Sequence, residues 1–255
     1  MSVLPRVRAT RYVAPLREGG SLPGLVEADD LGIYVCKFRG AGQGLNVLVA
    51  EVIVGELARV LGLRTPRLVG VDLTQGIARY EADEEVQDLL KASLGLNLGV
   101  DFLPGSFGFD SGISVDRDVA GRILWLDAFV ANVDRSWRNP NLLVWHGDVW
   151  VIDHGASLYF HHAWANGVTD PARFADQPWS ADDHVLRTHL DAVAGVADEL
   201  AEQITDDVLE QVTALVPDEW LVGPATPDEL RAAYRAFLRA RLEGSRGWLP
   251  RRGAA

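Results

Sequence analysis

The sequence predicts an α+β fold with two lobes, a small N-terminal β-sheet lobe that carries one helix and a mostly helical C-terminal lobe. Short runs of β-branched and aromatic residues, separated by Gly- and Pro-rich turns, fill the first 82 residues, and one segment with helical spacing interrupts them. From Asp83 onward helical patterns dominate, and only one hairpin is expected. We expect an N-terminal lobe of residues 1–100, a C-terminal lobe of residues 101–255 and a ligand cleft between them.

In the first half, turn residues divide the β-prone runs into separate strands. The expected strands are residues 9–16, 25–28, 32–38, 67–73 and 76–80. The helix is expected over residues 46–63, where apolar residues recur near a 3.6-residue period and Gly62 stands at the position of a helix stop.

In the second half, residues 95–112 are expected to connect helices rather than to form a strand, because Gly and Pro interrupt them. Thr226 to Glu229 form a capping box with Pro at the first helical position. His146, Gly147 and Asp148 suit the turn of a hairpin between residues 141–145 and 149–152. The expected helices are residues 83–94, 116–133, 180–196, 200–215 and 226–242.

Composition excludes several classes of protein. The chain has 24 basic and 36 acidic residues and a net charge of −12, which argues against a general nucleic-acid binder and against docking on an anionic membrane. Its single cysteine, Cys36, excludes an internal disulfide framework and a Cys-based zinc site. Without a signal-peptide pattern or a membrane-spanning apolar run, we expect a cytoplasmic protein.

Lys37 is the first candidate for chemistry. Only Lys37 and Lys91 are lysines among the 24 basic residues, and all the others are arginines. A lysine is therefore unusual in this chain. Lys37 ends an apolar strand, where an ammonium is costly unless it meets an anion such as a phosphate. Glu51 lies among apolar residues of the expected helix and could orient Lys37, while Glu56, one turn later, is the alternative.

A second group of polar residues surrounds the hairpin. Asp134 and Asn139 lie five residues apart after the apolar helix, and Asp153 ends the second hairpin strand, two residues before Gly155. Carboxylate and amide oxygens that converge suit Mg²⁺, and a further aspartate could accept a proton from a hydroxyl. The spacing of Asp134 and Asn139 is common by chance, so its weight comes from the strand and helix around it.

The glycine loop that follows the first strand contains Gly19, Gly20 and Ser21. Its backbone N–H groups and the Ser21 hydroxyl could cradle phosphates. The loop does not have the Walker pattern, which excludes a Walker-type phosphate site. It also lacks the Rossmann pattern followed by a helix, so a Rossmann nucleotide site is unsupported.

In this order, the glycine loop, strand lysine, helix glutamate, D-x₄-N loop and Asp-x-Gly resemble a protein-kinase-like fold. The resemblance is closest to HipA-like kinases and more remote to phosphatidylinositol 4-kinase-type catalytic domains. It implies that Lys37 holds ATP phosphates and pairs with Glu51, that Asp134 is the catalytic base, and that Asn139 and Asp153 bind Mg²⁺. Asn141, directly before the strand, is a rival to Asn139 for the metal.

The function that the resemblance implies is ATP- and Mg²⁺-dependent transfer of the γ-phosphate to a hydroxyl, most simply by a serine/threonine protein kinase. A small-molecule or lipid kinase and a non-catalytic ATP-binding module remain alternatives. The sequence identifies neither the acceptor nor a small antitoxin-like partner. The adenine hinge is open between residues 77–82 and residues 100–105.

Overall fold

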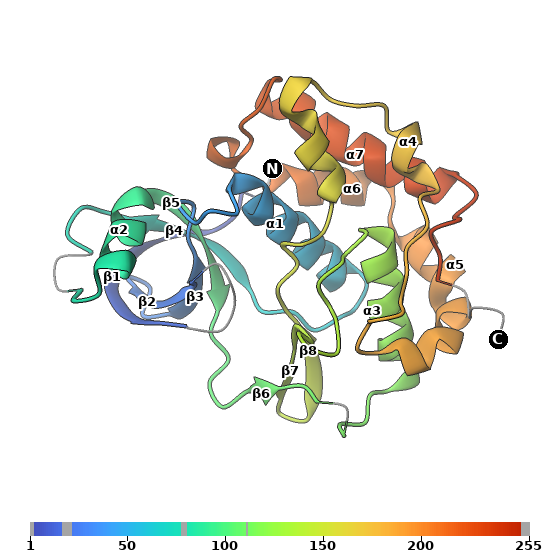
Figure 1. The fold of residues 1–255 in the computed structure, drawn as a ribbon, viewed down its shortest axis with the longest axis horizontal. Helices are drawn as coiled ribbons and strands as arrows, with labels where there is room; N and C mark the ends of the chain where they lie inside the picture. The colour runs from blue at the N-terminus through green and yellow to red at the C-terminus, as the bar shows by residue number, and fades with distance from the viewer. Residues whose placement is uncertain (1–2, 17–21, 78–80, 111, 251–255) are drawn as a thin grey trace.

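The computed structural model describes residues 3–16, 22–77, 81–110 and 112–250. Five of its strands close into a barrel in the order β1-β2-β3-β5-β4, with β1 and β4 pairing in parallel, and helices surround a second core beside it (Figure 1). The barrel strands are β1 (Arg6–Pro15), β2 (Gly24–Ala28), β3 (Ile33–Lys37), β4 (Leu68–Leu73) and β5 (Gly95–Asp101). The expected mixture of strands and helices is therefore confirmed.

Strand β5 corrects the expectation of a connecting segment at residues 95–112. It pairs antiparallel with both β3 and β4 and so closes the barrel. Its glycines suggested a loop, but Gly99 is required by packing, since a Cβ there would lie 2.6 Å from Val71 Cγ2. The strand expected at residues 76–80 is also wrong at its start, because Gly76 and Ile77 form a turn; residues 78–80 lie outside the described part.

Helix α1 (Leu45–Val60) crosses from the barrel to the helical half and packs against α6. Its residues from Leu48 to Ala58 are buried with the single exception of Glu56, which is partly buried. The helix ends as expected near Gly62, whose φ of 74° lies in the left-handed region. The core of α1 is therefore shared with the C-terminal helices, although α1 belongs by sequence to the first half.

The helical half contains shorter helices than the sequence suggests. The helix expected at 180–196 is a 3₁₀ segment followed by α5, and the helix expected at 200–215 is broken at Thr205, which caps α6 by accepting from Val208 N. The capping box at Thr226 is present and opens α7. The helices are α2 (Glu84–Ala92), α3 (Arg117–Phe129), α4 (Ala172–Ala175), α5 (Val193–Gln203), α6 (Asp206–Ala214) and α7 (Pro227–Glu243), with 3₁₀ helices at Tyr159–Asn166, Arg187–Ala192 and Asp218–Trp220.

The expected hairpin is present as β7 (Leu142–Trp145) and β8 (Asp148–Val151), joined by β6 (Phe107–Gly108) in a small sheet. His146 and Gly147 both have positive φ, 51° and 84°, as a type I′ hairpin turn requires. Helix α3 ends at Phe129, earlier than expected, and residues 130–141 form a loop that leads into β7. The hairpin thus brings the end of β8 back beside this loop.

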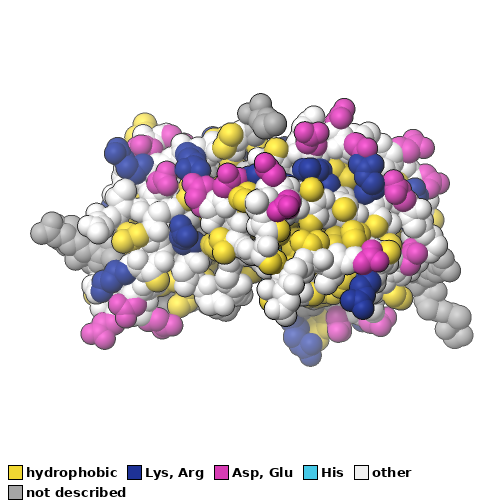
Figure 2. Space-filling model, turned by 90° about the horizontal axis from the view of Figure 1, so that it is seen from above, with side chains coloured by type: hydrophobic (Ala, Val, Ile, Leu, Met, Phe, Trp, Pro, Cys, Tyr) yellow, Lys and Arg dark blue, Asp and Glu magenta, His cyan; other side chains and the backbone are white. Residues whose placement is uncertain are grey.

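The surface carries both signs of charge. On the face in Figure 2, acidic and basic side chains are interspersed and no continuous basic area is present on that face. No helix within the described ranges is long and apolar enough to cross a bilayer.

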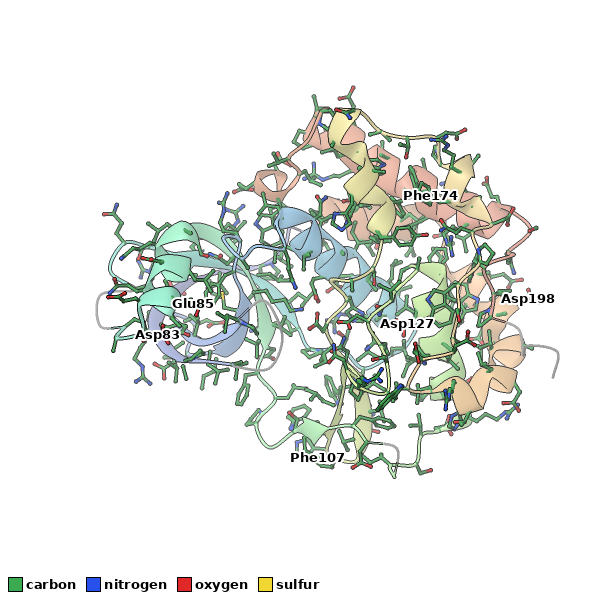
Figure 3. All side chains as sticks on the ribbon, viewed as in Figure 1. Asp83, Glu85, Phe107, Asp127, Phe174 and Asp198 are labelled. Carbon is green, nitrogen blue, oxygen red and sulfur yellow. The ribbon has the colours of Figure 1, made fainter. Side chains whose placement is uncertain are left out.

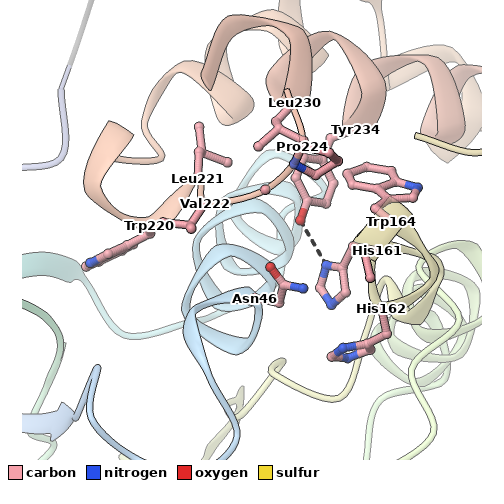
Figure 4. A pocket seen from close by; sticks show the side chains of 12 residues that line it. Asn46, His161, His162, Trp164, Trp220, Leu221, Val222, Pro224, Leu230 and Tyr234 are labelled. Atoms are coloured by element: carbon pink, nitrogen blue, oxygen red, sulfur yellow. Dashed lines mark hydrogen bonds between the residues drawn. The ribbon is translucent and has the colours of Figure 1, made fainter. Parts of the chain in front are cut away.

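Residue His161 should make folding stability depend on pH. Its ring is buried, with Nδ1 2.9 Å from the Tyr234 hydroxyl (Figure 4), and burial lowers its pKa to about 3. Between pH 6.5 and 3 the unfolded chain binds the proton that the native state excludes, so stability falls as pH falls, by about 1.4 kcal/mol per unit from this group.

Urea unfolding at pH 7, 6 and 5 tests this pH dependence. His161→Gln should show a shallower loss of unfolding free energy on acidification than the wild type, whereas the variant of its exposed neighbour, His162→Gln, serves as the matched control. Equal slopes in wild type and His161→Gln would contradict the assignment.

Candidate active site

A cleft of about 1010 Å³ lies where the barrel meets the helical half. Its walls come from β3, the start of α1, the chain after β5, the loop before β7 and the chain after β8. It contains Lys37, Asp134, Asn139, Asn141 and Asp153, which include most of the residues singled out from the sequence. Many apolar side chains also line it, among them Val35, Val100, Leu103, Leu142 and Ile152.

Lys37 joins the two halves of the chain. It is the last residue of β3, and its Nζ donates to Glu51 Oε1 on α1 and, at 2.7 Å, to Asp153 Oδ1 after β8. The Lys37 and Glu51 side chains are 14% and 3% exposed, whereas Asp153 is 48% exposed. The structure therefore selects Glu51 rather than Glu56, which pairs with Arg59 instead.

Lys37, Glu51 and Asp153 form an ion triad, and the charge of each member depends on the other two. Burial raises the pKa of Glu51 to about 7, against the opposing pull of Lys37. Burial alone would lower the pKa of Lys37, but Glu51 and Asp153 outweigh it and the pKa is raised. Burial also works against ionised Asp153, yet Lys37 holds its pKa below the ordinary range. Lys37 and Asp153 thus form the charged pair that faces the cleft.

The chain after β8 turns sharply to present Asp153. Asp153 has a φ of 54°, a conformation that few residues other than glycine adopt. Two residues later, a Cβ on Gly155 would lie 2.5 Å from Val47 Cγ1 and 3.1 Å from Glu51 Oε1. Glycine at position 155 therefore allows this turn to lie directly against α1, and this contact brings Asp153 close to Lys37.

Asp134 also lines the cleft and lies in the loop between α3 and β7. Asn139 Nδ2 donates to its Oδ2 at 2.9 Å. Asn141 Nδ2 donates to the Asp134 carbonyl at 2.8 Å and to Oδ2 at 3.3 Å. Asn139 is exposed and Asn141 is buried, with a φ of 47°. Both asparagines therefore hold Asp134 through their amide nitrogens, which leaves their amide oxygens available.

A buried ionic network supports this loop and was not predicted from the sequence. Asp127 of α3, labelled in Figure 3, accepts from Arg135 Nε at 2.6 Å and lies 3.0 Å from His184 Nε2. Arg135 in turn donates to the carbonyls of Asn141 and Ile152. Burial alone would raise the pKa of Asp127, but Arg135 and His184 outweigh it and hold that pKa below its usual range.

This network links the Asp134 loop to the end of β8, because Arg135 binds carbonyls on both. An aspartate within the apolar run of α3 was the available signal, since a charge among buried residues needs a partner. Its partners could not be read from the sequence, because His184 is 57 residues away.

The three residues of the predicted glycine loop, Gly19, Gly20 and Ser21, lie outside the described residues. Its flanks, Pro15, Leu16 and Pro23, line the cleft, and Leu16 N donates to the Pro23 carbonyl at 2.7 Å.

Of the two hinge candidates, the chain at residues 100–103 lines the cleft. It includes the end of β5 and connects the barrel to the hairpin sheet. Among the described residues of the other candidate, 77, 81 and 82, none lines the cleft.

Comparison with known proteins identifies the family. The fold is that of a kinase: the Helicobacter pylori proinflammatory kinase CtkA superposes with a TM-score of 0.58 at 10% identity, over 92% of this chain and 98% of that one. The Golgi casein kinase, solved with Mn and ADP bound, is more distant, with a TM-score of 0.39 at 12% identity over 97% of this chain and 75% of that one. No curated protein matches. The model of the HipA-like kinases matches residues 10–243, so the chain belongs to the HipA-like kinase family and is a phosphotransferase.

The Asp127–Arg135 pair should be important for stability. Asp127→Asn removes the anion and leaves the Arg135 guanidinium buried without its charge partner, which should lower the free energy of unfolding by about 3–5 kcal/mol. Asp198→Asn is the matched control, because Asp198 forms its ion pair with Arg246 while 94% exposed, and such pairs contribute about 0–1 kcal/mol. Denaturant titration of both variants measures the difference, and similar losses would contradict a special role for the buried pair.

Proposed function

We propose that this kinase transfers the γ-phosphate of ATP, with Mg²⁺, to the hydroxyl of a protein serine or threonine. The observation that carries the proposal is the Lys37 bridge between Glu51 and Asp153, in one cleft with Asp134 and its two asparagines. In this proposal residues 1–100 form the nucleotide-binding lobe, residues 101–255 form the catalytic lobe, and residues 100–105 form the hinge beside the adenine.

Lys37 binds the phosphates of ATP. Its ammonium is a compact charge at the end of a strand, and buried Glu51 keeps it pointed into the cleft. In the free protein Lys37 Nζ also donates to the Asp153 carboxylate. When ATP binds, a phosphate oxygen would take the place of the Asp153 oxygen on Lys37 Nζ, so one anionic acceptor replaces another. Binding of nucleotide then frees Asp153 for a second role.

Asp153 and Asn139 fit a magnesium site. Asp153 is half exposed in the cleft, and the Asn139 amide oxygen is left free by the bond from its nitrogen to Asp134. Mg²⁺ is commonly held by one or two protein groups together with substrate phosphates, and Asp153 and Asn139 would supply those protein groups. When bound, Mg²⁺ would neutralise charge on the transferring phosphoryl group.

Asp134 is the proposed catalytic base. It is partly buried and lines the cleft, where its carboxylate can accept the proton of a hydroxyl aligned for attack. Asn141 fixes the backbone and side chain of Asp134 at once, and Arg135 anchors the same loop to β8. The protein contributes mainly position and charge to the reaction, as is usual for phosphoryl transfer.

Removal of the proposed base tests the function. Asp134→Asn should reduce the rate of phosphoryl transfer by about 10²–10⁴-fold, since it cannot accept the hydroxyl proton. Transfer is measured with γ-labelled ATP and Mg²⁺ on lysate proteins, followed by mass spectrometry of the labelled products. Binding of Mg-ATP, measured by thermal shift, should be retained.

Three other outcomes would redirect the proposal. Full activity of Asp134→Asn would exclude Asp134 as the base. Labelled metabolites or lipids without labelled protein would change the acceptor class. Stabilisation of the wild type by Mg-ATP without any labelled product would favour a non-catalytic ATP-binding module.

The two asparagines should differ in their effects. Asn139→Ala should raise the Mg²⁺ concentration needed for half-maximal rate by about tenfold or more, because it removes a ligand. Asn141→Ala should lower kcat with a smaller change in the Mg²⁺ requirement, because it releases the Asp134 loop. Magnesium titrations of both variants at saturating ATP measure the split, and the opposite pattern would assign the metal to Asn141.

A further inference from the structure

Two large apolar side chains beside Asp134 are exposed to solvent. Val133 directly precedes Asp134 and is 70% exposed, and Trp137 follows three residues later and is 56% exposed. Neither lines the cleft that holds Lys37 and Asp153. An exposed valine and an exposed tryptophan that flank a proposed catalytic base in the sequence lie where an acceptor must approach, and we read them as a candidate contact surface.

The backbone holds Trp137 firmly although its side chain is exposed. Trp137 N donates to the Asp183 carbonyl at 3.0 Å, and Ser136 N donates to the Asn139 carbonyl at 3.0 Å. Ser136 also forms a β-bridge with His184, whose ring lies 3.0 Å from Asp127. The surface is therefore built on the same network that positions the Asp134 loop.

Arg138 adds a charge to this surface. Its guanidinium lies over the Trp137 ring, 4.0 Å from the centroid. Within the described residues the contact of the Arg138 guanidinium is this ring and not a carboxylate, although exposed Asp182 and Asp183 lie on the segment that pairs with this loop. The other arginine of the loop, Arg135, is buried and bound to Asp127, so Arg138 is the cation that this loop presents to solvent.

We propose that Val133, Trp137 and Arg138 form the acceptor platform, which binds a protein segment with an acidic residue close to the phosphorylated hydroxyl. This rests on the proposed function, because the platform is defined by its place around the base. An acceptor that touches Val133 and Trp137 must extend out of the cleft, which a polypeptide does and a small alcohol does not. Arg138, flat on the indole, offers its donors to a carboxylate, and apolar neighbours of the hydroxyl cover Val133 and Trp137.

The charge of Arg138 provides the sharpest test. Full-length wild-type protein and Arg138→Glu are given Mg-ATP and a positional-scanning library of serine peptides. The wild type should prefer Asp or Glu near the serine, and Arg138→Glu should lose this preference and select Lys or Arg at the same position. Arg173→Glu is the matched control, since Arg173 is exposed on α4, away from the platform residues in sequence, and it should keep the acidic preference.

The apolar part of the acceptor platform is tested by steady-state kinetics with the peptide that the wild type prefers. Trp137→Ala should lower kcat/KM on the order of tenfold through a higher KM, with kcat little changed, because the indole contributes binding rather than chemistry. Leu31→Ser changes an apolar residue that is 95% exposed in the turn between β2 and β3 and should leave both constants unchanged.

Direct binding separates failure of the platform from failure of the proposed function. Fluorescence anisotropy of a labelled acidic serine peptide reports binding without phosphoryl transfer, and Arg138→Glu should weaken it. Equal binding of acidic and basic peptides by the wild type, or an unchanged preference in Arg138→Glu, would overturn the platform even if ATP is consumed. Selective binding of the acidic peptide without any transfer would instead retain the platform and overturn the proposed reaction.

Discussion

The ion triad of Lys37, Glu51 and Asp153 is the interaction on which the site depends. One ammonium meets two carboxylates from segments that are 14 and 116 residues away along the chain. An ammonium and a carboxylate buried without each other would be too costly to keep charged, so the barrel, helix α1 and the chain after β8 are constrained to converge. Asp153 nevertheless remains half exposed at the cleft.

Helix α1 connects the ion triad to the rest of the molecule, because it carries Glu51 and packs in the core of the helical half. It is almost entirely buried, and it shares one hydrophobic core with the C-terminal helices and with Leu68, Leu96 and Leu98 of the barrel. Trp220 Nε1 donates to the Leu96 carbonyl of β5 at 3.0 Å and adds a second tie between the two regions. A change in the relative position of barrel and helices would therefore move Glu51 against Lys37, since the two side chains stand on opposite sides of that junction.

A second ionic centre, built on Asp127 and Arg135, organises the other wall of the cleft. Arg135 is surrounded by Asp127, by the carbonyls of Asn141 and Ile152, and by His154 Nδ1 at 3.3 Å. It thereby holds the Asp134 loop and the residues around Asp153 in one arrangement. The proposed acceptor platform consists of exposed residues of the same loop, so one buried network supports both the proposed base and the surface proposed to bind its substrate.

The sequence by itself determined the mixed class of the fold and singled out most of the residues that gather at the candidate site. Strand, helix and hairpin patterns predicted β1 to β4, α1 and the β7–β8 hairpin, because local propensity and turn chemistry agree there with the tertiary fold. An ammonium in an apolar strand and a carboxylate in an apolar helix marked Lys37 and Glu51, since such groups need partners wherever they are buried. The roles assigned to Asp134, Asn139 and Asp153 came from their order along the chain, and they stay predictions.

Only the tertiary structure decided the rest. Strand β5 was missed because Gly99 is selected by the side chains of Val69 and Val71 on the neighbouring strand, a contact that no local pattern contains. The choice of Glu51 over Glu56 follows from which face of α1 meets Lys37. The partners of Asp127, and the exposure of Trp137 and Arg138 beside Asp134, likewise depend on segments far apart in sequence, because burial and charge pairing are properties of the packed chain.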